Sequence, residues 1–185
     1  ALEQTRAKTI EKVIAAKPPK PIGVVPHVET GASKQVLDGV LKQLSSYPQG
    51  FMVHPKLLRQ FEVRDALIAK DGDVDWATAE ALAIGSLLIE GTSVRLAGQD
   101  TRRGTFSHRH STLVDYLDER RWVPIAEIPG AAGRFWVYDS LLSEYAAMGF
   151  EYGYAHANQK ALVMWEAQFG DFVNGAQIII DQYLV

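Results

Sequence analysis

The chain has 185 residues, of which 47% are hydrophobic and 22% are charged. This is the size and balance of one folded domain with a short appendage, and it excludes wholesale disorder. A formal net charge of -3 gives no basic surface, and no apolar run approaches the roughly 20 residues of a membrane helix. We therefore expect neither nucleic acid nor a membrane as a partner. The absence of cysteine excludes disulfides, thiolate metal sites and a cysteine nucleophile, and it fits a reducing, cytoplasmic compartment.

Both ends of the sequence indicate a piece of a longer protein. The chain begins at Ala1 rather than at methionine, and it stops at Val185 inside the apolar pattern of residues 178–185. Natural termini are usually polar and frayed. We therefore expect a domain that is truncated at its C-terminal end.

Residues 1–70 are predicted to form a helical N-terminal segment or linker. An amphipathic helix is expected over 1–16, followed by a proline-rich break and an extended or looped stretch at 22–31. Apolar residues then recur at helical spacing over 36–44 and 55–67, which predicts two further helices. This part of the sequence shows no cluster of catalytic residue types, so packing helices or a linker to a preceding domain is the expected role.

Residues 71–185 alternate helical and strand patterns. The predicted elements are a helix capped by Asp75 and running to residue 90, strands at 93–97, 135–138 and 161–165, a helix at 142–156, and a helix from residue 175. Strands separated by helices form parallel sheets that are covered on both faces. The expected fold is therefore α/β, a three-layer sandwich with a mainly parallel sheet, preceded by the helical segment.

The acidic stretch 71–75 resembles a calcium loop only at first sight. Trp76 stands where the sharp turn needs glycine, and Leu82 stands where the bidentate carboxylate belongs. A diphosphate-binding motif starting at Gly72 also fails, because no asparagine follows before Asn158. The stretch is interpreted as a loop with a helix cap, and no metal ligand is predicted in this chain.

The segment 98–110 carries the densest polar chemistry. It follows a predicted strand, where open α/β sheets bind ligands, and it holds two glycines, two histidines and three arginines in thirteen residues. Guanidinium groups bind carboxylates or phosphates, and histidines titrate near neutral pH. A solvated charged loop is the alternative. A zinc site lacks a third ligand at a suitable spacing.

Two further segments combine polar and small or aromatic residues. In 140–154, Glu144 lies in the first turn of the predicted helix, where a carboxylate can act chemically or simply favour the helix dipole. In 165–172, Phe169 and Phe172 can be ordinary core or can stack on a planar ring, and Asp171 can cap the last helix.

Taken together, the segments 95–110, 142–154 and 165–174 resemble one family. It is the thiamin-diphosphate-dependent first component of 2-oxoglutarate dehydrogenase, including the actinobacterial 2-oxoglutarate decarboxylases. The resemblance is dense over 71–185 and looser before it. It implies a transketolase-like pyrimidine-binding domain within an enzyme that decarboxylates 2-oxoglutarate and passes the succinyl unit to a lipoyl group.

The resemblance also implies cofactors and partners. These are thiamin diphosphate, Mg²⁺ whose ligands are expected upstream of this chain, a homodimer with the site at the subunit interface, and a lipoyl-bearing succinyltransferase component. Because this domain would hold half a site, the 185-residue piece alone is expected to be inactive. There are two alternative functions. One is another thiamin-diphosphate-dependent 2-oxo acid dehydrogenase or carboligase, and the other is a non-catalytic dimerisation module.

The family assigns its activating acid most naturally to Glu144. Such a glutamate hydrogen-bonds ring nitrogen N1′ of the aminopyrimidine and favours the imino tautomer, which removes the thiazolium C2 proton and so allows attack on the keto carbon. An apolar setting would favour a protonated carboxyl; the residues expected to provide it are Leu141, Leu142, Met148 and Phe150. Glu151 is the rival.

The remaining site residues follow from the same resemblance. Phe172, with Phe169 as its alternative, is expected to stack on the pyrimidine. Gln99 and Asp100 are expected to contact the cofactor. The catalytic candidates beside Glu144 are His108 and His110, and the substrate-binding candidates are Arg109 and His110. The same loop can equally serve the dimer interface.

Overall fold

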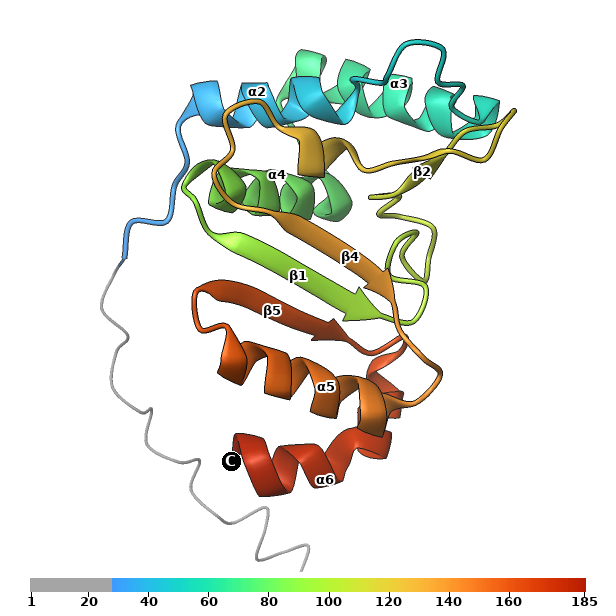
Figure 1. Ribbon diagram of the computed structural model, residues 1–185. Coiled ribbons are helices and arrows are strands. Elements are labelled where there is room, and N and C mark those ends of the chain that lie inside the picture. The colour runs from blue at the N-terminus through green and yellow to red at the C-terminus, as the bar shows by residue number, and fades with distance from the viewer. Residues whose placement is uncertain (1–27) are drawn as a thin grey trace, which may run out of the picture. The chain divides into compact units, whose positions relative to one another are not determined.

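A parallel three-stranded sheet forms the centre of the fold, as the alternating pattern predicts. The computed structural model describes residues 28–185 (Figure 1), so the helix expected over 1–16 lies outside the described residues. The strands occur in the order β4-β1-β5, with bounds β1 Ser93–Gly98, β4 Phe135–Asp139 and β5 Ala161–Glu166. Both neighbours run parallel to β1, with Val94 opposite Phe135 and Leu162.

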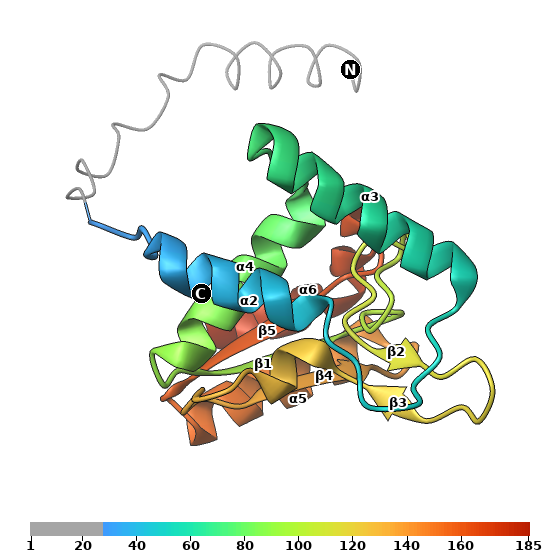
Figure 2. The ribbon, with the colours of Figure 1, turned by 90° about the horizontal axis from the view of Figure 1, so that it is seen from above.

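Helices cover both faces of this sheet. Helix α4 (Trp76–Ile89) lies on one face and helix α5 (Glu144–Ala157) on the other (Figure 1). The α/β architecture with a mainly parallel sheet is therefore confirmed. Helices α2 (Lys34–Leu44) and α3 (Pro55–Asp71) lie on the far side of α4 from the sheet (Figure 1, Figure 2).

Helix α2 packs closely on α4 because α4 has a glycine at the contact. A Cβ atom on Gly85 would lie 2.6 Å from Cγ1 of Val40, which is fully buried. Residues 32–185 form one compact unit, so α2 and α3 pack with the sheet domain. The domain boundary expected at residue 71 stays a prediction.

Most helix ends follow the predicted chemistry. Oδ1 of Asp75 accepts a 2.7 Å hydrogen bond from the backbone N–H of Thr78, and Gly72 ends α3 in the left-handed conformation (φ 73°). The loop-and-cap interpretation of 71–75 is confirmed. No three histidine, aspartate or glutamate side chains within 28–185 are grouped to hold a metal ion. In the same part of the chain, no helix has the length and apolarity to span a bilayer.

The short elements of the fold were not predicted from the sequence patterns. Strands β2 (Leu113–Val114) and β3 (Arg121–Trp122) form an antiparallel pair, followed by the 3₁₀ helix η1 (Pro124–Glu127). Two residues are too few to show alternation. The helix expected from residue 175 is divided into three short pieces, which are η2 Gly170–Ala176, α6 Gln177–Ile179 and η3 Ile180–Leu184. Helix η2 has no side-chain cap, so Asp171 does not cap it.

Candidate functional site

Gln99 and Glu144 meet at the carboxyl end of the sheet. Strand β1 ends at Gly98, whose carbonyl accepts a 2.8 Å hydrogen bond from the N–H of Ser140 in the loop that leads into α5. Ser143 caps α5 through the N–H of Ala146, which makes Glu144 the first residue of the helix. Nε2 of Gln99 donates a 2.8 Å hydrogen bond to Oε1 of Glu144. The end of β1 and the start of α5 are therefore joined through a single carboxylate.

The second oxygen of Glu144 remains available. Oε2 receives no hydrogen bond from residues 28–185. It lies beside Gly175 of η2, where a Cβ atom would be 3.2 Å away. The expected apolar enclosure is wrong for two of its members within this chain, because Leu141 and Leu142 are 76% and 86% exposed.

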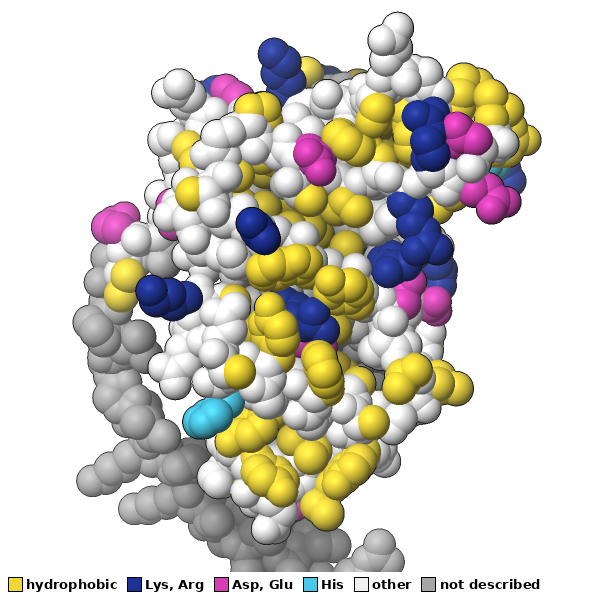
Figure 3. Space-filling view, viewed as in Figure 1, with side chains coloured by type: hydrophobic (Ala, Val, Ile, Leu, Met, Phe, Trp, Pro, Cys, Tyr) yellow, Lys and Arg dark blue, Asp and Glu magenta, His cyan; other side chains and the backbone are white. Residues whose placement is uncertain are grey.

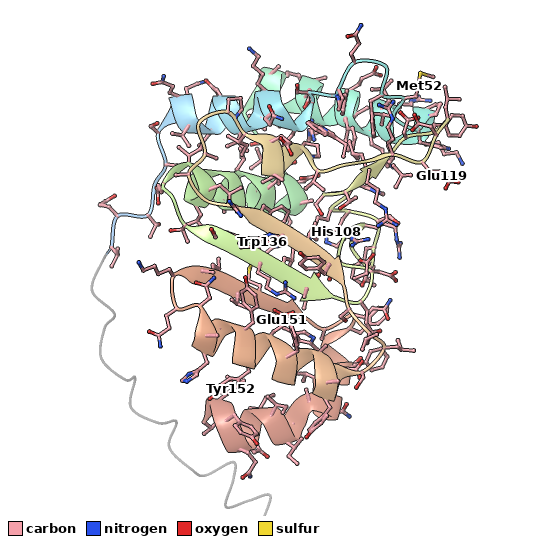
Figure 4. All side chains as sticks on the ribbon, viewed as in Figure 1. Met52, His108, Glu119, Trp136, Glu151 and Tyr152 are labelled. Atoms are coloured by element: carbon pink, nitrogen blue, oxygen red, sulfur yellow. The ribbon has the colours of Figure 1, made fainter. Side chains whose placement is uncertain are left out.

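Glu151, the alternative activating acid, forms an ion pair with Arg95 instead. Its two oxygens accept hydrogen bonds of 2.6 and 2.8 Å from the guanidinium of Arg95, and only 6% of its side chain is exposed. The same guanidinium lies 4.6 Å from the ring centroids of Tyr138 and Tyr154. Figure 4 places Glu151 between α5 and the sheet. This carboxylate is a buried ion-pair partner, so it is poorly placed to meet a ligand.

The two predicted stacking rings lie together. Phe169 and Phe172 pack edge to face with ring centroids 5.7 Å apart, and Phe106 packs on Phe169 at 5.8 Å. Phe169 and Phe172 are 42% and 45% exposed, which is unusual for core aromatics and leaves ring surface open.

Asp100 holds its own loop. Its carboxylate accepts a 2.8 Å hydrogen bond from Nε2 of Gln168 and pairs with Arg103 at 3.0 Å. Its backbone is left-handed at φ 55°, an uncommon conformation for a residue other than glycine. The side chain therefore connects the loop after β1 to the residue before Phe169.

The two histidines line one cavity together, and only His108 also lines a second space. His108, labelled in Figure 4, packs on Gly104. It lines an open groove of about 590 Å³ that Trp76 and Phe169 also line. His110 has no part in that groove. Both histidines line a smaller cavity of about 110 Å³ toward α3, which Phe61 also borders.

The charge state of His110 follows from its surroundings. Burial lowers the pKa of His110, and a hydrogen bond with the backbone of Ser107 offsets only part of this effect. Because the ordinary pKa of histidine is already near 6.5, the His110 imidazole is mainly neutral at pH 7.

Arg109 is fully occupied inside the protein. Its five N–H groups donate to Glu80 (2.6 and 3.0 Å), Glu166 (2.7 and 2.9 Å) and the carbonyl of Thr101 (2.9 Å), and 7% of its side chain is exposed. Burial alone would lower the pKa of Arg109, but its hydrogen bonds with Glu166 and Glu80 raise the pKa above its ordinary value. No donor is left for a substrate carboxylate. The substrate-binding assignment of Arg109 is therefore corrected.

Several site residues were missed by sequence reasoning. Glu166 and Thr101 bind Arg109, and Gly175 borders Glu144, but nothing in their local sequence distinguishes them. Glu80 did have a signal. It is the only charged residue in α4, whose other residues are mostly apolar. A lone charge in such a helix indicates a buried partner, because an isolated buried charge is costly.

Comparisons with known proteins show similarity over most of the chain. Residues 72–185 match the family model described as "Transketolase, pyrimidine binding domain". The chain is 53% identical over 155 residues to the "2-oxoglutarate dehydrogenase E1 component" of Rickettsia felis, covering 84% of this chain and 16% of that protein. It is 45% identical over 170 residues to the "2-oxoglutarate dehydrogenase, mitochondrial" of Saccharomyces cerevisiae, covering 91% and 17%.

A third relative has a broader name. The chain is 47% identical over 163 residues to the "Multifunctional 2-oxoglutarate metabolism enzyme" of Mycolicibacterium vanbaalenii, covering 85% of this chain and 13% of that protein. The chain thus spans 13% to 17% of the length of these curated relatives.

Proposed function

Because this chain belongs to the transketolase pyrimidine-binding domain family, we propose that it supplies the pyrimidine-binding half of a thiamin diphosphate site in a 2-oxoglutarate-decarboxylating enzyme. The observation that carries this proposal is the Gln99–Glu144 hydrogen bond at the carboxyl end of the sheet. It leaves one carboxyl oxygen available at the start of a helix. The names of the three relatives, each built on 2-oxoglutarate, support the choice of substrate.

The residues around Glu144 fit an aminopyrimidine ring. Oε2 can share a proton with a ring nitrogen, while Gln99 fixes Oε1. Gly175 leaves space beside Oε2 that any side chain would reduce. The half-exposed rings of Phe172 and Phe169 can stack on a planar heterocycle. When bound, thiamin diphosphate supplies the group that accepts the electron pair released on decarboxylation.

Within this half site, Glu144 has the central role. With thiamin diphosphate bound, its carboxyl would be the group that holds or shares a proton with the pyrimidine nitrogen, which requires hydrogen-bonding distance. Gln99 acts on Glu144 rather than on the cofactor directly. Asp100 acts one step further away, because it holds Gln168 beside Phe169.

The histidines are proposed to differ in role. His108 shares its groove with Phe169, so it is placed to meet the substrate or an intermediate. His110, which faces the α3 side as a neutral imidazole, stays a predicted catalytic or substrate-binding residue with weaker geometric support.

The complete enzyme is proposed to be a homodimer with this site at the subunit interface. Figure 3 shows hydrophobic side chains gathered over β4 and α5. The exposed members are Tyr138, Leu141, Leu142, Tyr145 and Phe150. Contiguous exposed apolar surface of this kind marks interaction sites. A second subunit would cover it and would complete the half site that begins at Glu144.

Magnesium and the acyl acceptor belong to the same proposal. The Mg²⁺ ligands are placed in another domain of the full-length protein, and the succinyl unit is passed to a lipoyl-bearing succinyltransferase. A substrate panel tests the assignment. The full-length protein should release CO₂ from 2-oxoglutarate in preference to pyruvate or branched 2-oxo acids, and only with thiamin diphosphate and Mg²⁺ present. Preference for another 2-oxo acid would overturn the substrate assignment but leave the thiamin diphosphate assignment intact.

A further inference from the structure

The buried guanidinium of Arg109 joins one helix, α4, to the end of one strand, β5, at the carboxyl end of the sheet. Arg109 binds Glu80 from α4 and Glu166 from the end of β5, each through two hydrogen bonds of 2.6 to 3.0 Å. We call Arg109, Glu80, Glu166 and Thr101 the arginine clamp. None of its members has been given a role in the proposed reaction.

The clamp fixes the backbone on both sides of Gln99. On one side, Thr101 is fully buried, its carbonyl accepts from Arg109 at 2.9 Å, and its hydroxyl lies 3.1 Å from Oε2 of Glu166. On the other side, Gly98 is so close to Glu166 that a Cβ atom would lie 2.3 Å from its carbonyl oxygen. The position of Gln99 is therefore set by Glu166 and Thr101, and both of these are held by Arg109.

The loop needs such restraint. Asp100, Ser107 and His110 all have positive φ values (55°, 53° and 43°), which cost energy for residues other than glycine. Conformations of this kind persist only where the surrounding contacts determine them. The clamp joins this loop to α4 and β5, and the Gln168–Asp100 hydrogen bond and the hydrogen bond from Arg102 N–H to Asp139 restrain it further.

The side chain of Arg109 is 7% exposed, and those of Glu80 and Glu166 are 27% and 31% exposed, so forming this ion pair removes a guanidinium and part of two carboxylates from water at a cost. Well-packed apolar side chains often stabilise a protein as well as a buried ion pair does. What a guanidinium fork adds is a fixed, bidentate geometry. We propose that Arg109 is a positioning residue: through Glu166 and Thr101 it orients Gln99 so that its amide meets Oε1 of Glu144. This inference rests on the role of Glu144 in the proposed function.

The test uses the full-length protein with its cofactors and three variants. In Arg109→Lys the charge stays, but a single ammonium cannot span both carboxylates. Glu80→Gln weakens the clamp and leaves the hydrogen bonds between Arg109 and Glu166 in place. This milder variant replaces Arg109→Lys in the test if Arg109→Lys does not fold. Arg120→Lys is the matched control, because Arg120 also pairs with two acids, Asp118 and Asp115, while 51% of its side chain is exposed.

The kinetic result separates positioning from substrate binding. Arg109→Lys should lower kcat by about 10- to 100-fold while KM for 2-oxoglutarate changes by less than about 3-fold. Glu80→Gln should change kcat in the same direction, and Arg120→Lys should change neither constant. A KM raised about 10-fold or more with kcat retained would instead make Arg109 a substrate-binding residue and overturn the proposal.

A double-mutant cycle tests whether the effect passes through Gln99. In a Gln99→Ala background, Arg109→Lys should lower kcat by less than about 3-fold, since the group that it positions is already absent. Full additivity of the two substitutions would overturn the proposal, because it would mean that Arg109 acts independently of Gln99.

Hydrogen exchange gives a readout that needs no activity. Without bound cofactor, Arg109→Lys should speed amide exchange in residues 98–104, whereas Arg120→Lys should not. Unchanged exchange in that segment overturns the positioning role even if the enzyme acts on another substrate. The two proposals can fail separately. If wild type does not decarboxylate 2-oxoglutarate but Arg109→Lys still shows the faster exchange, the proposed function is refuted and the positioning role of Arg109 stands.

Discussion

Nε2 of Gln99 lies 2.8 Å from Oε1 of Glu144, although the two residues are 45 positions apart in the chain. The contact joins the end of β1 to the first residue of α5. It also distinguishes the two oxygens of one carboxyl, because Oε1 is held by an amide and Oε2 faces Gly175. A carboxyl that is fixed at one oxygen and available at the other is suited to hydrogen-bond a ring nitrogen in one orientation.

The first prediction concerns the function of this carboxyl. Glu144→Gln in the full-length protein should lower kcat by about 100-fold or more, because an amide cannot exchange the proton that acid-base catalysis requires. The thermal unfolding midpoint should stay close to that of wild type, since Glu144 makes one hydrogen bond at the site. Substantial loss of folded protein would show that the effect is structural.

Glu151→Gln is the matched control, with the same substitution on the same helix. It leaves the buried guanidinium of Arg95 without its anionic partner, and the side chains of this pair are only 13% and 6% exposed. Breaking such a pair typically costs about 3–5 kcal/mol of unfolding free energy. Chemical denaturation should therefore show a large loss for Glu151→Gln. Unchanged stability would mean that the pair contributes little to the fold.

Gly98→Ala should destabilise the protein. A Cβ atom at this position would meet the carbonyl oxygen of Glu166 at 2.3 Å and the hydroxyl of Thr101 at 2.5 Å. The backbone carbonyl cannot move aside as a flexible side chain can. Overpacking is therefore expected to lower the free energy of unfolding by about 1–3 kcal/mol. Gly153→Ala is the control, because a Cβ atom there has no neighbour within 4 Å and the residue lies inside α5. It should gain about 0.5–1 kcal/mol in helix stability. Equal unfolding midpoints for the two variants would contradict the close approach at Gly98.

Acid should weaken the protein through Asp115. Hydrogen bonds from the backbone N–H groups of Leu117 and Met52 lower the pKa of Asp115 below its ordinary value. Because the folded state favours the ionised carboxylate, this stabilisation is present above the unfolded pKa of about 3.9 and is lost as the pH falls through the lower folded pKa.

Urea denaturation at pH 7, 4 and 3 checks this prediction. Asp115→Asn should be less stable than wild type at pH 7, and the difference between the two proteins should shrink as the pH falls below about 4. Other carboxylates with lowered pKa values, such as Glu166, affect both proteins equally. A difference that stays constant with pH would contradict the role of the ionised carboxylate.

Sequence patterns predicted the elements of the sheet domain because those elements are periodic. Strand β1 and helix α4 lie within a residue or two of their expected bounds. The choice between Glu144 and Glu151 could not be made in this way, since both lie on one helix. It depends on Arg95, which is 56 positions from Glu151 and reaches it only in the folded chain.

The segment 98–110 shows the same limit. Arg109 was predicted to meet a substrate carboxylate, but the carboxylates that it binds in this chain are those of Glu80 and Glu166. The backbone is left-handed at Ser107 and His110, which no alternation pattern indicates. Such conformations are set by tertiary contacts.

The most direct test of the account is CO₂ release from 2-oxoglutarate by the full-length protein that contains this chain, measured with and without thiamin diphosphate and Mg²⁺, for wild type and Glu144→Gln. Release by wild type should depend on both additions, and release by folded Glu144→Gln should be lower by about 100-fold or more. No release from folded wild type would contradict the proposed reaction. Near-normal release from Glu144→Gln would remove this carboxyl from the mechanism.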